Sequence, residues 1–231
     1  DRPGGDGLST LLVPPLAGDD DWPSLGAEVA AWMEDGLAFG PGDLLGSPYR
    51  VDAEFRAILE RLYQVVPPDH AGPCRFEGWR CVRGSGGCGR RRFDIGVIMT
   101  RKGSCKSERA GAIAAVELAA DGPVRCDGFT RRDSTWRPVG RPVTSPFIPI
   151  FAFAREQAED TAWDSLSAMI AAGPAAARFA VWGERITRLD GDGEARPFAS
   201  APDSRDGART TWQVKEESHR WDSARHRAAH I

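Results

Sequence analysis

The residues best suited to chemistry form a cationic stretch that leads into an apolar helical pattern. Lys106 and Ser107 open this helix, and they are preceded by Arg101, Lys102, Gly103, Ser104 and Cys105. A Lys-Ser pair at a helix start is typical of a nucleotide-phosphate loop. In such a loop the backbone N–H groups surround the phosphates, the ammonium reaches the β- and γ-phosphates, and the hydroxyl binds Mg²⁺. The standard pattern also has two glycines, and Thr100 and Cys105 occupy their positions here.

A pair of adjacent carboxylates lies much later in the chain. Glu216 and Glu217 follow residues 210–214, a β-branched and aromatic stretch that predicts a strand. A phosphate-loop ATPase needs an acidic residue at a strand end to hold the Mg²⁺ shell, and a carboxylate beside it can polarise the attacking water. Each signal also has a plain structural interpretation: the first is a basic turn that caps an ordinary helix, and the second is a solvent-exposed helix start. Their order along one predicted sheet favours the nucleotide interpretation.

Strands and helices in alternation are expected to position these residues. Residues 93–99 predict a buried parallel strand directly before the cationic loop, and residues 108–120 predict the helix after it. Further helices are expected at 27–33, 52–66 and 156–172, further strands at 146–153 and 179–182, and a hairpin with its turn at 190–193. Residues 124–143 predict a long loop or an irregular hairpin. This rhythm is typical of an α/β domain with a mainly parallel sheet, in which ligands lie at the carboxyl ends of the strands.

Composition sets the limits of these interpretations. The chain has 231 residues, 41 % of them hydrophobic, and a net charge of −3, which indicates one folded domain and excludes a broadly basic nucleic-acid coat. Residues 1–25 predict an extended N-terminal arm, and residues 26–231 the domain itself. We expect no membrane span, because no run of eighteen apolar residues occurs.

The five cysteines, Cys74, Cys81, Cys88, Cys105 and Cys126, are expected to be free thiols in a reducing compartment. Three of them and His70 lie in the loop of residues 69–92, but no pair has the Cys-x-x-Cys spacing of a zinc site. The spacing therefore favours free thiols in a loop over a zinc site, which is kept as the lesser alternative. The loop ends in Arg90, Arg91 and Arg92, and it is interpreted as a surface insertion or as a basic patch that contacts phosphates.

Taken in order, several segments resemble the large terminase subunit of tailed bacteriophages, the ATP-driven motor that packages DNA into the capsid. The segments are residues 12–16, 37–44, 101–108, 122–128, 140–146, 184–186 and 203–211. Residues 101–108 are similar to the family's glycine-poor Walker A loop, and 203–211 lead into its Walker B region. The resemblance runs from about residue 12 to residue 227, and the family's later ATPase strands and C-terminal nuclease domain have no counterpart in this chain.

The resemblance implies a fold and a set of roles. The fold is a three-layer P-loop NTPase-type domain with a mainly parallel sheet, incomplete at its C-terminus and without the nuclease domain. Lys106 would bind the β- and γ-phosphates, Arg101 would add a phosphate contact, and residues 101–107 as a whole would surround the nucleotide. Ser107 and Glu216 would hold Mg²⁺. Glu217 would be the catalytic carboxylate that orients water.

The implied function is ATP hydrolysis, with ATP and Mg²⁺ as cofactors, that drives double-stranded DNA into a capsid. The implied partners are that DNA, a portal protein, the small terminase subunit and further copies of the chain in a ring, in the cytoplasm of a bacterial host. Arg185, Arg188, Arg205 and Arg209 are candidates for an arginine that acts in trans, and the sequence does not choose among them.

Two positions depart from the family pattern. Glu216 stands where the family usually has Asp, and Lys215 stands where it usually has an apolar residue. Because an unpaired buried ammonium is costly, the end of this strand is expected to be exposed or Lys215 to be paired. These departures support an alternative function, a catalytically impaired remnant or a passive Arg-rich module that binds DNA or a capsid partner. A different, helicase-like ATPase is the third hypothesis.

Overall fold

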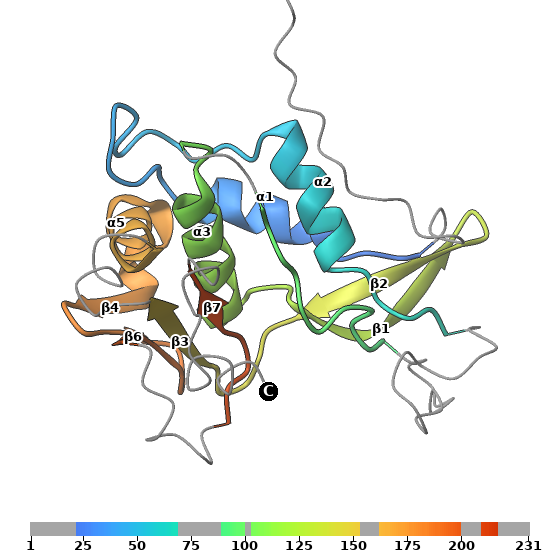
Figure 1. The fold of residues 1–231 in the computed structure, drawn as a ribbon. Helices are drawn as coiled ribbons and strands as arrows, with labels where there is room; N and C mark the ends of the chain where they lie inside the picture. Colours follow the sequence, from blue (N-terminus) through green and yellow to red (C-terminus); the bar gives the residue numbers. More distant parts are fainter. Residues whose placement is uncertain (1–21, 69–88, 100–102, 153–161, 200–208, 217–231) are drawn as a thin grey trace, which may run out of the picture.

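The computed structural model describes residues 22–68, 89–99, 103–152, 162–199 and 209–216 (Figure 1). Its first two helices, α1 (Gly26–Gly36) and α2 (Ala53–Leu62), pack closely against each other. The closest approach is at Gly26, where an added Cβ would lie 2.4 Å from the Cα of Glu60. The backbone N–H of Phe55 donates to the Asp52 carboxylate at 2.7 Å, so Asp52 is the N-cap of α2.

Helix α2 confirms the first part of the helix expected over 52–66. It buries Phe55, Ile58, Leu59 and Leu62 on one face, as the three- and four-residue spacing predicted. The helix ends at Leu62 because the next residues pair elsewhere. The N–H of Val65 donates to the carbonyl of Pro23, and that of Val66 to the carbonyl of Arg90.

Helices α3 (Lys106–Leu118) and α5 (Asp164–Ala172) lie side by side over the main sheet (Figure 1). A glycine makes their contact close: an added Cβ at Gly111 would lie 3.0 Å from the backbone nitrogen of Leu166. Helix α3 confirms the helix expected over 108–120 and begins two residues earlier. The described part of the helix expected over 156–172 is α5, which the short 3-10 helix η2 (Pro174–Arg178) follows.

The main sheet has five strands in the order β4-β5-β6-β3-β7. The strands are β3 (Phe147–Ala152), β4 (Phe179–Trp182), β5 (Arg185–Arg188), β6 (Glu194–Ala199) and β7 (Val214–Lys215). Strand β3 runs parallel to β6 and β7, whereas β4, β5 and β6 are antiparallel. The α/β class is confirmed, but the sheet is mixed. The short turns before and after β5 reverse the chain, which makes the neighbouring strands antiparallel.

Helices cover the sheet on the face of Ile148 and Ile150, which are both fully buried. Helices α3 and α5 form this layer, and α1 and α2 lie beyond α3 (Figure 1). Phe147 and Phe151 both contact Phe198 on the other face of the sheet, the first edge-on and the second with tilted rings. Within the described ranges no helix covers that face, so the second helical layer of the expected three-layer fold is not seen there.

A separate two-stranded hairpin extends away from the helices and the main sheet (Figure 1). It pairs β1 (Arg125–Arg132) with β2 (Thr135–Arg141) in antiparallel register. Asp133 and Ser134 form its two-residue turn with φ values of 49° and 67°, the left-handed pair that suits a tight hairpin turn. The irregular hairpin expected within 124–143 is therefore confirmed, and its irregularity is a register shift between Cys126 and Phe129.

The strand expected at 93–99 is wrong. These residues form no strand, and Ile95, Val97 and Met99 are 73 %, 73 % and 86 % exposed. The intervening positions face the protein: Ile98 packs on the core, and an added Cβ at Gly96 would meet the Leu62 side chain at 2.9 Å. An apolar run predicts burial from composition alone, but a strand needs a partner, and this segment lies against α2 instead of pairing with the sheet.

A buried charge cluster joins three distant segments beneath the helices. The fully buried Glu117 carboxylate of α3 accepts hydrogen bonds from Tyr63 Oη at 2.9 Å, from Arg125 Nη1 at 3.1 Å and from Arg91 Nη2. The guanidinium of Arg92 lies 4.1 Å from the Trp22 ring centroid. Arg91 and Arg92 therefore hold the fold together, which does not favour the basic-patch interpretation of Arg90–Arg92.

No helix in the described part of the chain has both the length and the apolar character that a membrane span requires.

Candidate functional site

Ser107 and Glu216, which are far apart in the chain, meet at the carboxyl end of β7. The hydroxyl of Ser107 donates to Glu216 Oε1 at 2.7 Å. Glu216 directly follows β7, and its backbone N–H donates to the carbonyl of Phe151 at 3.0 Å, which continues the ladder between β7 and β3. Its second carboxylate oxygen accepts from the N–H of Ala162 at 3.2 Å. One carboxylate thus joins the first turn of α3 to the chain that enters α5.

Two left-handed residues bring the chain into α3. Gly103 has φ +82°, and Cys105, the N-cap residue, has φ +55°. The Cys105 side chain makes no capping hydrogen bond to this helix start. Because the first N–H groups of a helix have no partners within it and carry the positive end of the helix dipole, such a start attracts anions. Lys106, the first residue of the helix, is exposed, and Ser107 is half-buried.

The structure places some of the predicted site residues and not others. Gly103, Ser104, Cys105, Lys106 and Ser107 run consecutively into α3, next to Glu216. Arg101, Lys102 and Glu217 lie outside the described residues, so their predicted roles remain predictions. Cys74, Cys81 and Cys88 also lie outside the described residues, whereas Cys105 and Cys126 are thiols that form no disulfide.

A polar cluster that sequence reasoning missed lies beside the first turn of α3. The buried guanidinium of Arg109 pairs with the carboxylates of Asp52 and Glu54, each at 3.0 Å, and lies over the Phe55 ring. From the sequence, Asp52 is only the first residue of the helix predicted over 52–66. The segment 37–44 also comes close, since an added Cβ at Gly40 would lie 3.5 Å from Glu108 Oε1. Nothing in local spacing joins these segments, so only their packing reveals the cluster.

Burial and nearby carboxylates alter the acid–base properties of this region. Burial raises the pKa of the Cys105 thiol, and the Glu108 carboxylate raises it further, so the thiol stays neutral at neutral pH. Burial and Glu108 raise the pKa of Tyr49 in the same way. Cys105 and Tyr49 therefore add no negative charge beside the start of α3.

Lys215, the unexpected cation of β7, points away from Glu216. Successive side chains of a strand leave on opposite faces, so Val214 and Glu216 share one face and Lys215 takes the other. Lys215 is half-buried, and burial lowers the pKa of its ammonium. The Glu216 carboxylate is instead engaged by Ser107 and Ala162.

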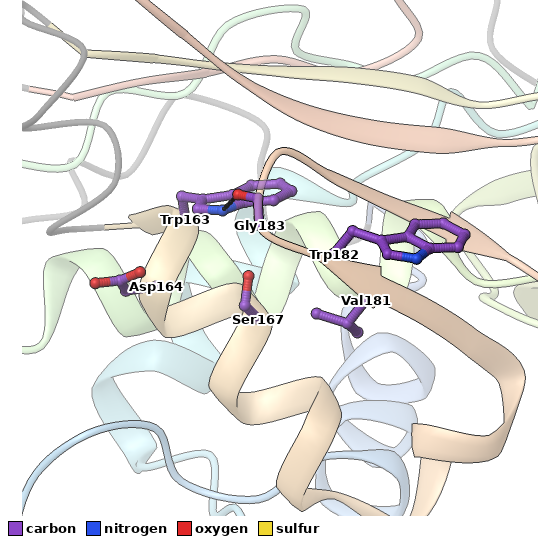
Figure 2. A pocket seen from close by; sticks show the side chains of 6 residues that line it. All are labelled: Trp163, Asp164, Ser167, Val181, Trp182 and Gly183. Atoms are coloured by element: carbon purple, nitrogen blue, oxygen red, sulfur yellow. Dashed lines mark hydrogen bonds between the residues drawn. The ribbon is translucent and has the colours of Figure 1, made fainter.

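A separate hollow of about 340 Å³ lies between the first turn of α5 and the turn that joins β4 to β5 (Figure 2). Its lining residues are Trp163, Asp164, Ser167, Val181, Trp182 and Gly183. Trp163 Nε1 donates to the carbonyl of Gly183 at 2.9 Å and so holds the two elements together. None of the predicted site residues lines this hollow.

The described residues contain no cluster of three or more His, Cys, Asp or Glu side chains that could hold a metal ion. A cation at the Ser107–Glu216 pair would therefore take one hydroxyl and one carboxylate from this part of the chain, and its other ligands would come from elsewhere. This is the donor set of a Mg²⁺ that is shared with phosphates and water.

Comparisons of this chain with models of protein families, with curated proteins and with solved structures find no match.

Proposed function

We propose that this chain binds Mg-ATP at the start of α3 and hydrolyses it, as the ATPase domain of a phage or prophage motor that moves double-stranded DNA into a capsid. The observation that carries the proposal is the 2.7 Å hydrogen bond between Ser107 Oγ and Glu216 Oε1. A hydroxyl at a helix start beside a carboxylate at a parallel strand end is the donor pair that holds Mg²⁺ in phosphate-loop ATPases.

The residues around this pair fit the proposed ligand. The uncapped start of α3 offers backbone N–H groups to the phosphates, and Lys106 adds a flexible ammonium at the same place. Ser107 and Glu216 would hold Mg²⁺, which when bound neutralises charge on the phosphate oxygens. Glu217 is proposed as the carboxylate that orients the attacking water, and Arg101 as a further phosphate contact.

The longer side chain of Glu216 is compatible with this role. Its second carboxylate oxygen accepts from the N–H of Ala162, so the side chain is held at both oxygens. Two such contacts reduce the freedom that an additional methylene would give. Glu216 can therefore present one oxygen beside the Ser107 hydroxyl as a shorter Asp would.

Calorimetric titration of the purified chain with Mg-ATP tests the proposal. We expect saturable binding by the unchanged protein and an affinity about 10- to 100-fold lower for Lys106→Ala, because a charge-assisted contact to phosphate is lost. Ser107→Ala should bind ATP but lose most of its dependence on Mg²⁺. Arg50→Ala, which removes one exposed positive charge from the segment before α2, is the matched control and should bind as the unchanged protein does.

Two results would contradict the proposal. One is the absence of Mg-ATP binding by protein that unfolds cooperatively on heating. The other is equal binding by the unchanged protein and by Lys106→Ala. Either result would favour the alternative, a passive module without nucleotide chemistry. If binding is found, hydrolysis is tested next, with Glu217→Gln expected to bind Mg-ATP and not to release phosphate.

A further inference from the structure

The β1–β2 hairpin is much more basic than the rest of the chain. Residues 125–141 contain five arginines and two aspartates, a net charge of +3, whereas the whole chain carries −3. We propose that this hairpin is the surface of the protein that contacts the phosphate backbone of duplex DNA. The inference rests on the proposed function, which names duplex DNA as a partner, and it adds the surface that contacts this DNA; none of the hairpin residues belongs to the nucleotide site.

The two faces of the hairpin differ in chemistry. On one face Phe129 packs on the core, Pro138 is buried, and Trp136 lies edge-on to Phe129 with ring centroids 6.3 Å apart. On the other face Arg132 and Arg137 are exposed, each directly opposite a threonine of the partner strand. Arg141 lies further along the same face. One face therefore anchors the hairpin, and the other presents arginines to solvent.

Aromatic stacking holds a further arginine at the tip. Arg131 is exposed and lies directly opposite Trp136, and its guanidinium is 5.2 Å from the Trp136 ring centroid. A guanidinium that stacks on an indole keeps its N–H donors free at its edge, where a phosphate can accept them. Arg131 leaves its strand on the face of Phe129 and Trp136, and Arg132 and Arg137 lie on the opposite face, so the tip carries exposed arginines on both faces of the ribbon.

The two aspartates do not cancel this charge. Asp133 is 91 % exposed and reaches Arg132 only at 3.8 Å, while Asp127 pairs with Arg141 at 3.5 Å near the base. Exposed pairs of this kind are weak and are easily exchanged for a phosphate contact. Arg131 and Arg137 at the tip therefore stay available to a ligand, and Arg132 can join them.

The base of the hairpin is held rigidly. Arg125 Nη1 donates to the buried Glu117 and Arg125 Nη2 to the carbonyl of Thr211, both within 3.1 Å. At β2 the N–H of Gly140 donates to the Glu28 carboxylate, and Pro123 lies within 2.9 Å of an added Cβ at Gly140. A rigid ribbon loses little conformational entropy when it binds.

Shape and charge together favour duplex DNA as the partner. A two-stranded ribbon is one of the two elements that the major groove admits, and arginine is well suited to phosphate because its planar donors bind in pairs. The hairpin stands away from the helices, so a large, regularly charged partner can approach its exposed face (Figure 1). The sequence of the DNA plays no part in the proposal, since phosphate contacts carry no sequence information.

Fluorescence anisotropy with a labelled duplex of mixed sequence tests the proposal, in the absence of nucleotide and over a series of salt concentrations. The test variant is Arg132→Gln/Arg137→Gln. We expect about tenfold weaker binding and a slope of log affinity against log salt that is smaller by about 2, because two phosphate contacts are lost. The control is Arg50→Gln/Arg185→Gln, which removes the same charge from exposed positions elsewhere and should keep the full slope.

Thermal unfolding of both variants checks that the fold is intact. The proposal is overturned if the unchanged protein does not bind the duplex, or if both double variants weaken binding equally. It is also overturned if poly-glutamate at equal charge concentration displaces the duplex completely, which would indicate an acidic protein partner. Lys106→Ala should bind DNA normally, so failure of the nucleotide proposal and failure of this one give different results.

Discussion

Arg125 joins the base of the β1–β2 hairpin to the segment that leads into β7. Its Nη2 donates to the carbonyl of Thr211 at 3.0 Å, and the N–H of Thr211 donates in turn to the carbonyl of Phe147 in β3 at 3.1 Å. Through its Nη1 the same side chain reaches Glu117 of α3. The Arg125 guanidinium thus connects the hairpin to helix α3 and to the segment that precedes β7.

Arg125→Gln should destabilise the protein by about 1–3 kcal/mol, because Thr211 loses its donor and Glu117 loses one of its two guanidinium partners. Urea unfolding measures the change. Arg141 lies directly opposite Arg125 in the hairpin and is exposed. Arg141→Gln should therefore change the free energy of unfolding by less than about 0.5 kcal/mol. Equal effects of the two variants would mean that the contacts of Arg125 contribute little.

Glu117→Gln should have a larger effect than the loss of either arginine. The carboxylate is fully buried, and its replacement leaves the guanidinium groups of Arg91 and Arg125 close together without a counter-charge. Breaking a buried ion pair in this way costs about 3–5 kcal/mol. The same urea titration measures it, with Glu184→Gln on the exposed β4–β5 turn as the control. A loss below that of Arg125→Gln would contradict the central position of Glu117.

The hydrogen bond between Ser107 and Glu216 should be measurable without any ligand. We expect a double-mutant cycle of Ser107→Ala and Glu216→Gln to give a coupling free energy of unfolding of about 1–2 kcal/mol, since the bond is charge-assisted and only part-buried. Lys106→Ala with Glu216→Gln supplies a neighbouring pair for comparison. A coupling within error of zero for Ser107 and Glu216 would show that the two groups do not interact in solution.

Asp52 makes stability depend on pH. Burial raises the pKa of its carboxyl, but the Phe55 N–H and the Arg109 guanidinium favour the charged form more strongly, and the pKa is lowered overall. A lowered folded-state pKa contributes stability above the unfolded value of about 3.9, and this is lost as the pH falls through the folded value.

Asn also caps helices well, so Asp52→Asn isolates the charge. We expect it to lower the melting temperature at neutral pH and to match the unchanged protein once the pH has fallen below the folded-state pKa of Asp52. The effect is a few tenths of a kcal/mol, because the side chain is 57 % exposed and solvent screens the ion pair. Asp52→Ala removes the cap as well and should be less stable at both pH values. A pH-independent difference for Asp52→Asn would argue against the ion pair with Arg109.

Gly26 is required by the close contact of α1 with α2. Gly26→Ala would place a Cβ 2.4 Å from the Glu60 backbone, so the helices must separate, and we expect a loss of more than about 2 kcal/mol. Gly36→Ala at the other end of α1 meets its nearest atom at 3.5 Å and should be neutral or slightly stabilising, because Ala favours helix. Thermal unfolding compares them, and similar melting temperatures would contradict the contact.

Local patterns were sufficient for most of the elements. The apolar spacing of α2, the Ala-rich run of α3, the apolar run of β3 and the Gly-Asp turn before β6 each predicted an element that the structure contains. These signals depend on neighbours within a few residues, which the sequence displays directly. Residues 93–99 carry an equally strong apolar signal, yet they form no strand, because strand formation depends on a partner that the local sequence does not specify.

Residue patterns alone were enough to predict the α/β class, the helices and most strands, and residue type and order singled out Lys106, Ser107 and Glu216. Only the packed chain shows that the sheet is mixed, that Arg91 pairs with the buried Glu117 carboxylate, and that Lys215 and Glu216 point to opposite faces at the end of β7. It also shows that the Ser107 hydroxyl meets Glu216. The difference arises because capping and periodicity act over one or two turns, whereas strand partners, buried ion pairs and contacts between distant residues depend on how the whole chain packs.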